Sequence, residues 1–147
     1  MTNSSVGQAA TELLADPVIS DDDVLGRVAD LIAPAARSLR TLLLFFLEPD
    51  GTQASLVVRA DGLPERPAAA AAGHVCYVAS ESIAQAAALE SVVITLTRPG
   101  TLQRTDADRR LLRALQHGAG RYATPVRMLC LATPDGVREL GPVRPTR

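Results

Sequence analysis

Residues 91–115, SVVITLTRPGTLQRTDADRRLLRAL, combine a strand, a turn and a helix. The segment Val92–Leu96 is apolar and rich in β-branched residues, which is typical of a buried strand. A Pro-Gly pair then turns the chain. Thr105 followed by Asp108 is typical of a helix N-terminus, because the hydroxyl and the carboxylate cap free backbone N–H groups. This stretch therefore predicts a helix that follows directly on a sheet strand.

The rest of the chain extends this pattern in both directions. Residues 42–47 are apolar at every position, which predicts a strand covered on both faces. Before the opening stretch we predict a helix capped by Ser20 and ended by Pro34, a hairpin turning at 48–51, a strand at 75–78 and a helix from Ser80 to Leu89. The strand at 92–96 and the helix from Thr105 follow, and this helix is predicted to end near Gly118. A hairpin turning at 134–136 closes the domain. This order predicts an α/β fold: a single-domain, three-layer-like sandwich in which helices flank a mixed β-sheet.

The length and composition fit one domain with an aliphatic core. The chain has 147 residues, of which 47% are hydrophobic and only 3% aromatic. We expect a flexible N-terminal arm at 1–16, the α/β domain at 17–140 and a C-terminal tail at 141–147. The formal net charge of -1 gives no electrostatic footprint for nucleic acid. The N-terminus lacks the pattern of a signal peptide and no apolar run approaches a membrane span, so we expect a cytoplasmic protein.

Metal and nucleophile candidates are few. His74 and Cys76 are two residues apart, and on the predicted strand they share one face. Together with Asp108 or Glu81 they form a weak candidate for a transition-metal site. With only Cys76 and Cys130 in the chain, two buried thiols are the favoured interpretation. None of the serines lies in a G-x-S-x-G motif, so no nucleophile is predicted.

Arginines and glycines of the last predicted helix have ordinary explanations. Its arginines, at positions 104, 109, 110 and 113, alternate with Asp106 and Asp108, which is typical of a solvated helix face. Binding of an acidic partner is the alternative for these arginines. Gly118 and Gly120 are interpreted as a C-cap, and His117 as a side chain near the negative end of the helix dipole.

The order of elements resembles the JAB/MPN domain in its bacterial RadC-like form, from about Asp16 to Leu140. The stretches DPVISDDDVLGRVADLI and LLLFFLEPDGTQASLVV are similar to the helix and hairpin that open that domain. The family's zinc motif is His-x-His-Pro followed by Ser-x-x-Asp on a helix. This chain has Leu96-Thr97-Arg98-Pro99 and then Thr105-Asp106-Ala107-Asp108. The resemblance therefore implies a remnant of a metal site at Leu96, Arg98, Thr105 and Asp108.

The departures from the family motif point away from catalysis. Leu96 and Arg98 stand where the family has histidines, and neither side chain binds zinc. A catalytic zinc needs about three protein ligands, so we expect Asp108 to form an ion pair with Arg98 instead. The resemblance then implies a pseudoenzyme: a protein-interaction or scaffold module without cofactor, pairing with a second copy or another protein. The alternative is an unconventional zinc hydrolase using Asp108, His74 and a third ligand.

A second resemblance covers the N-terminal half. The segment from Asp22 to Glu65, a helix and two strands around an acidic-Gly turn followed by Gly-Leu-Pro-Glu, is similar to the start of a GAF domain. This resemblance implies a regulatory pocket for a small molecule. The later helix and hairpin fit the JAB/MPN order better, so the GAF domain ranks second.

Overall fold

The computed structural model of the chain describes residues 16–61 and 69–145, and it contains one mixed sheet of five strands. The strands are β1 (Thr41–Leu47), β2 (Gln53–Asp61), β3 (Ser91–Thr97), β4 (Val126–Thr133) and β5 (Gly136–Gly141). Their order across the sheet is β2-β1-β3-β4-β5. β3 and β4 are parallel, whereas β1 runs antiparallel to both of its neighbours and β5 runs antiparallel to β4. Residues 1–15 of the predicted arm lie outside the described residues.

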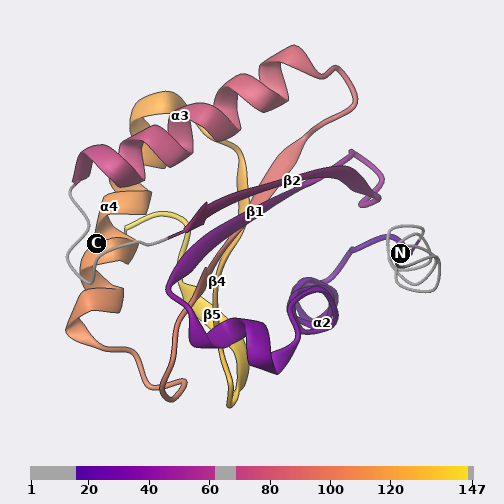
Figure 1. Cartoon of the computed structure of the whole chain (residues 1–147). Helices are drawn as coiled ribbons and strands as arrows, with labels where there is room; N and C mark the ends of the chain where they lie inside the picture. Colours follow the sequence, from indigo (N-terminus) through magenta and orange to yellow (C-terminus); the bar gives the residue numbers. More distant parts are fainter. Residues whose placement is uncertain (1–15, 62–68, 146–147) are drawn as a thin grey trace.

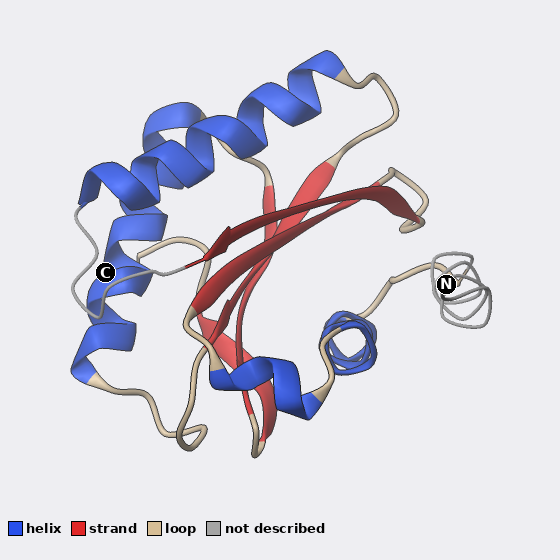
Figure 2. Ribbon diagram, in the orientation of Figure 1, coloured by secondary structure: helices blue, strands red, loops and turns tan. Residues whose placement is uncertain are grey.

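Helices cover both faces of the sheet (Figures 1 and 2). The helices are α2 (Asp21–Leu31), the 3₁₀ helix η1 (Pro34–Ser38), α3 (Ala69–Gln85) and α4 (Asp106–Tyr122). α2 packs on one face of the sheet, and α3 and α4 pack together on the other face. The predicted α/β sandwich with a mixed sheet is therefore confirmed, and the predicted order of elements agrees with the structure except for the strand expected at 75–78.

β1 lies at the centre of two hydrophobic clusters. Leu44 and Phe46 face the cluster beneath α3 and α4, whereas Phe45 and Leu47 face the cluster beneath α2. These side chains are almost completely buried, so the strand is covered on both faces as predicted. β1 is therefore unavailable as an interface, since both its faces and both its edges are covered.

Local capping fixes where the helices begin. Ser20 and Thr105 each accept a hydrogen bond from the N3 backbone N–H, and the carboxylate of the N3 aspartate accepts one from the backbone N–H of the cap residue. α2 ends at Leu31, three residues before Pro34, which confirms the predicted stop. The buried Arg37 then donates hydrogen bonds to carbonyl groups at the end of α2 and to the carbonyl of Thr133 on β4.

Three predictions about local structure are wrong. Residues 75–78 are not a strand and Ser80 does not begin a helix, because α3 is a single helix from Ala69 to Gln85. Its alanine-rich first turn favours helix, and its valines lie on the buried face rather than forming a separate strand. The glycines at 118 and 120 are not a C-cap, since α4 continues to Tyr122 and ends at Ala123 in the left-handed region (φ 52°).

The close packing of α3 on α4 explains why α4 tolerates Gly118. A Cβ at position 118 would lie 3.0 Å from Cys76 Sγ and 3.2 Å from Gly73 Cα. The two helices therefore approach through glycine at this crossing. At Gly120, by contrast, a Cβ would have no neighbour within 4 Å.

Gly118→Ala is predicted to lower the free energy of unfolding by about 1–3 kcal/mol, because the added methyl group overpacks the crossing. Gly120→Ala is the matched control and is predicted to raise it by about 0.5–1 kcal/mol, since alanine favours helix over glycine. Urea unfolding monitored by circular dichroism measures both. Equal effects of the two substitutions would contradict the packing explanation.

Candidate functional site

A buried ion pair joins the end of β3 to the first turn of α4. Arg98 Nη2 lies 2.7 Å from Asp108 Oδ2, and Arg98 Nε lies 2.9 Å from Asp108 Oδ1. Arg98 is 6% exposed and Asp108 is fully buried. The paired contacts give the two-point geometry that makes Arg–carboxylate pairs strong and directional. The ion pair expected from the sequence is confirmed.

The remaining polar atoms of the pair are also bonded. Arg98 Nη1 donates to the carbonyl of Pro99 at 2.8 Å, and Nη2 donates to the carbonyl of Gln103 at 3.0 Å. Asp108 Oδ2 accepts from the backbone N–H of Thr105 at 2.9 Å. The guanidinium thus holds the whole loop between β3 and α4, and full bonding offsets the desolvation of both charges.

The ion pair keeps Asp108 ionised despite its burial. Burial alone would raise the pKa of this carboxyl group. Hydrogen bonds from Arg98 and from the Thr105 backbone, together with the charge of Arg98, outweigh burial, and the pKa of Asp108 falls below its usual value. The Asp108 carboxylate is therefore a charged group with a structural role, bound to the Arg98 guanidinium.

The four positions at which the resemblance implies a metal site do not fit a zinc ion. The structure brings Arg98, Thr105 and Asp108 together, but Leu96 is buried in the core cluster beneath α3 and α4. The Thr105 hydroxyl accepts from the Asp108 backbone as a helix cap. Both Asp108 oxygens are bound to Arg98, and a guanidinium is a permanent cation without a lone pair. Three protein ligands for zinc are therefore not present at these positions.

The weak candidates His74 and Cys76 do not form a site, because they lie on a helix and not on a strand. Two residues along a helix correspond to a rotation of about 200°. His74 is therefore exposed, while Cys76 is buried against α4, where its thiol contacts the carbonyl of Leu115. Within residues 16–61 and 69–145, no group of three or more His, Cys, Asp or Glu side chains is arranged to hold a metal.

The two cysteines are buried thiols, as the sequence predicted. Burial raises the pKa of Cys76 to about 11 and that of Cys130 to about 12. Reactive cysteines have lowered pKa values and some exposure, so neither thiol is a nucleophile at neutral pH.

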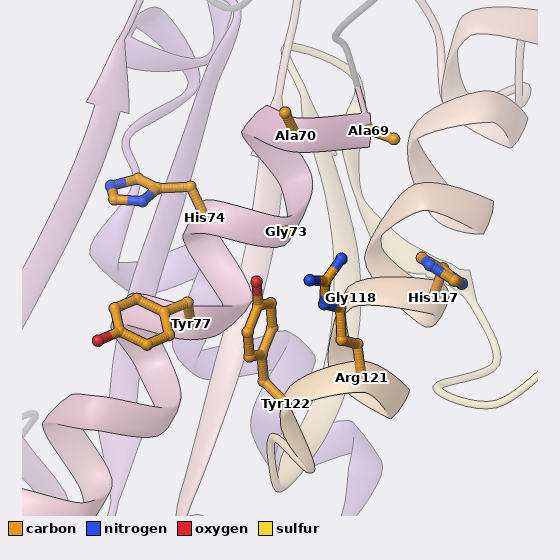
Figure 3. Close-up of a pocket in the computed structure, with 9 residues that line it drawn as sticks. All are labelled: Ala69, Ala70, Gly73, His74, Tyr77, His117, Gly118, Arg121 and Tyr122. Carbon is orange, nitrogen blue, oxygen red and sulfur yellow. The ribbon is translucent and has the colours of Figure 1, made fainter.

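A groove between α3 and α4 is a feature that the sequence analysis missed (Figure 3). It has a volume of about 600 Å³. Its lining residues are Ala69, Ala70, Gly73, His74, Tyr77, His117, Gly118, Arg121 and Tyr122. His74 and His117 lie on opposite sides of it and do not converge (Figure 3). A correct helix assignment for residues 69–85 would have been needed to find this groove.

A second cavity, of about 740 Å³, lies beside the ion pair. Arg40 and Leu39 line it on one side, and Thr105 and Arg110 line it on the α4 side. Arg98 reaches this cavity with its guanidinium already bound to Asp108, Pro99 and Gln103.

Comparison with protein-family models, with curated proteins and with solved structures found no match to this chain. The two family resemblances therefore rest on the residues and the order of elements alone. Among the described helices, none has the length and apolar character needed to cross a membrane.

Asp108→Ala is predicted to lower the free energy of unfolding by about 3–5 kcal/mol, because it leaves the buried Arg98 charge without its partner. Asp106→Ala is the control in the same helical turn. Asp106 is exposed and pairs with Arg109 at the surface, so its loss is predicted to cost less than about 1 kcal/mol. Chemical denaturation of both variants measures the difference. Similar losses in the two variants would contradict the role assigned to Asp108.

The stability that Asp108 contributes is predicted to depend on pH. Because its pKa is lowered in the folded state, the contribution is present above the unfolded pKa of about 4 and is lost as pH falls through the folded pKa. The difference in unfolding free energy between wild type and Asp108→Asn should therefore shrink from neutral pH towards pH 3 and below. A difference that stays constant over this range would contradict the lowered pKa.

Proposed function

We propose that this chain is a non-catalytic JAB/MPN-like domain that acts as a protein-interaction or scaffold module. The observation that carries the proposal is the Arg98 guanidinium bound to Asp108 at the place where the resemblance implies a metal. In this proposal the fixed positive charge of Arg98 takes over the structural task of a cation, which is to balance the Asp108 carboxylate.

The order of elements supports the family part of the proposal. α2, the β1–β2 hairpin, α3, β3, α4 and the β4–β5 hairpin follow the sequence of elements that the resemblance implies. Arg98 and Asp108 also lie at the implied places, just after β3 and in the first turn of α4. In this proposal the site lacks the donors of the family motif while the order of the surrounding elements is kept.

Exposed apolar side chains support the interaction part of the proposal. Leu56 and Val57 are 43% and 45% exposed on β2, an edge strand of the sheet. Edge strands with exposed apolar residues favour pairing with another chain. Leu39 and Tyr77 are further exposed apolar or aromatic side chains at other places on the surface. A second copy and a different protein are both candidate partners.

The two alternatives have less support. For a GAF-like regulatory domain, the relevant observation is an apolar cavity between the β1–β2 hairpin and α3, lined by Leu44, Val58 and Val75 among others. Its volume of about 200 Å³ is smaller than the roughly 300–1,000 Å³ of common ligand pockets. For an unconventional zinc hydrolase, Asp108 would have to leave Arg98, and His74 lies on the outer surface of α3.

Metal analysis tests the proposal against the hydrolase. Wild type and Asp108→Asn, both purified without chelator, are predicted to contain no stoichiometric zinc by elemental analysis. About one zinc per wild-type chain, lost in Asp108→Asn, would contradict the proposal and indicate a metalloenzyme. Asp108→Asn is preferred to alanine here because it keeps the size and shape of the side chain.

A further inference from the structure

The outer face of α4 carries a stripe of cationic side chains. Arg110, Arg113, His117 and Arg121 follow one another at spacings of three, four and four residues, which places them on one side of the helix. All four are exposed. The stripe, called here the arginine face, extends over about 16 Å along α4.

The nearby carboxylates do not neutralise the arginine face. Asp106, the first residue of α4, lies on the same side of the helix, but its carboxylate pairs with Arg109 at 3.0 Å. Asp108 is buried and bound to Arg98. Within the described residues, neither Arg110 nor Arg113 forms an ion pair, and Arg121 contacts the ring of Tyr122 instead of a carboxylate. Arg109, Arg110 and Arg113 are exposed, as expected of a solvated helix face, and among the described residues only Arg109 of these three forms an ion pair.

The opposing charge of the molecule lies on the other side of the sheet. Asp21, Asp22, Asp23 and Asp30 are exposed on α2, which covers the opposite face from α4 (Figure 1). The net charge of -1 is a sum over the whole chain, so it does not exclude local surfaces of one sign. A protein with a small net charge can still have a surface on which charges of one sign predominate. Such a surface favours a partner of opposite charge.

The groove between α3 and α4 runs beside the arginine face. Tyr77 and Tyr122 form an edge-to-face pair with ring centroids 5.5 Å apart, and the Arg121 guanidinium lies 5.4 Å from the Tyr122 ring. Gly73 and Gly118 also line the groove, and none of its nine lining residues carries a carboxylate. Figure 3 shows the Tyr122 ring between the Tyr77 and Arg121 side chains. Tyrosine and arginine are the side chains most often found in the centre of protein interfaces.

We propose that the arginine face and the adjoining tyrosine groove dock an acidic segment of a partner protein. Carboxylates of the segment pair with Arg110, Arg113 and Arg121, and an apolar or aromatic side chain of the segment enters the groove against Tyr77 and Tyr122. This inference rests on the proposed interaction role and names the chemistry of the partner. The short stripe and the acidic α2 pole favour a short acidic peptide over nucleic acid, because a long polyanion would extend towards like charge.

Fluorescence polarisation with labelled peptides tests this docking site at low salt. The probes are a glutamate-rich peptide with one central phenylalanine, the same peptide with alanine in place of phenylalanine, and a single-stranded oligothymidylate of equal charge. The phenylalanine peptide is expected to bind wild type most tightly. Arg113→Glu/Arg121→Glu is expected to weaken this binding at least about tenfold. Tyr77→Ala is expected to remove the preference for phenylalanine.

The matched control is Arg59→Glu/Arg144→Glu, which makes the same change in total charge at two exposed arginines outside α4. It is expected to weaken binding much less than the α4 double variant. Absence of peptide binding to wild type, equal losses in the two double variants, or tighter binding of the oligothymidylate would each overturn the inference. These outcomes are independent of zinc content, so failure here is distinct from failure of the proposed loss of the metal site.

Discussion

The Arg98–Asp108 ion pair is the contact on which the arrangement of β3, α4 and the loop between them depends. It is the only ion pair with both side chains buried among the described residues. Arg98 is fixed at the end of β3, and Asp108 is fixed by the Thr105 cap, so the pair sets the start of α4 relative to the sheet. α4 then positions α3 through the Gly118 crossing. The tyrosine groove and the arginine face both follow from this placement.

Buried arginine is used in three ways in this fold. Arg98 faces a carboxylate, Arg37 donates to three backbone carbonyls, and Arg27 donates to Gln53 Oε1 and to the carbonyl of Asp16. Of these three arginines, only Arg98 has a carboxylate partner that balances its charge. A buried pair of this kind contributes less net stability than its short distances suggest, because both charges lose their hydration. Its main effect is to fix the geometry of the loop between β3 and α4.

Much of the local structure was predictable, because caps, turns and buried strands are encoded by adjacent residues. Ser20, Thr105 and the hairpin turn at 48–51 are examples. The ion pair was expected because Arg98 and Asp108 fall at positions where the resemblance implies zinc ligands, and an arginine there can only balance the carboxylate. α3 was not, since the valines of 75–78 fit a strand as well as a helix until burial against α4 is known. The groove depends on that same packing, so the sequence pattern alone did not indicate it, whereas the arginines of α4 were already candidates for binding an acidic partner.

Arg98 and Asp108 are predicted to act as one unit, because each buried charge has the other as its partner. A double-mutant cycle of Arg98→Met, Asp108→Leu and the combined variant measures this coupling in the free energy of unfolding. The predicted result is a coupling energy above about 1.5 kcal/mol, with the combined variant more stable than Asp108→Leu alone. Additive effects of the two substitutions would contradict the central role of the pair.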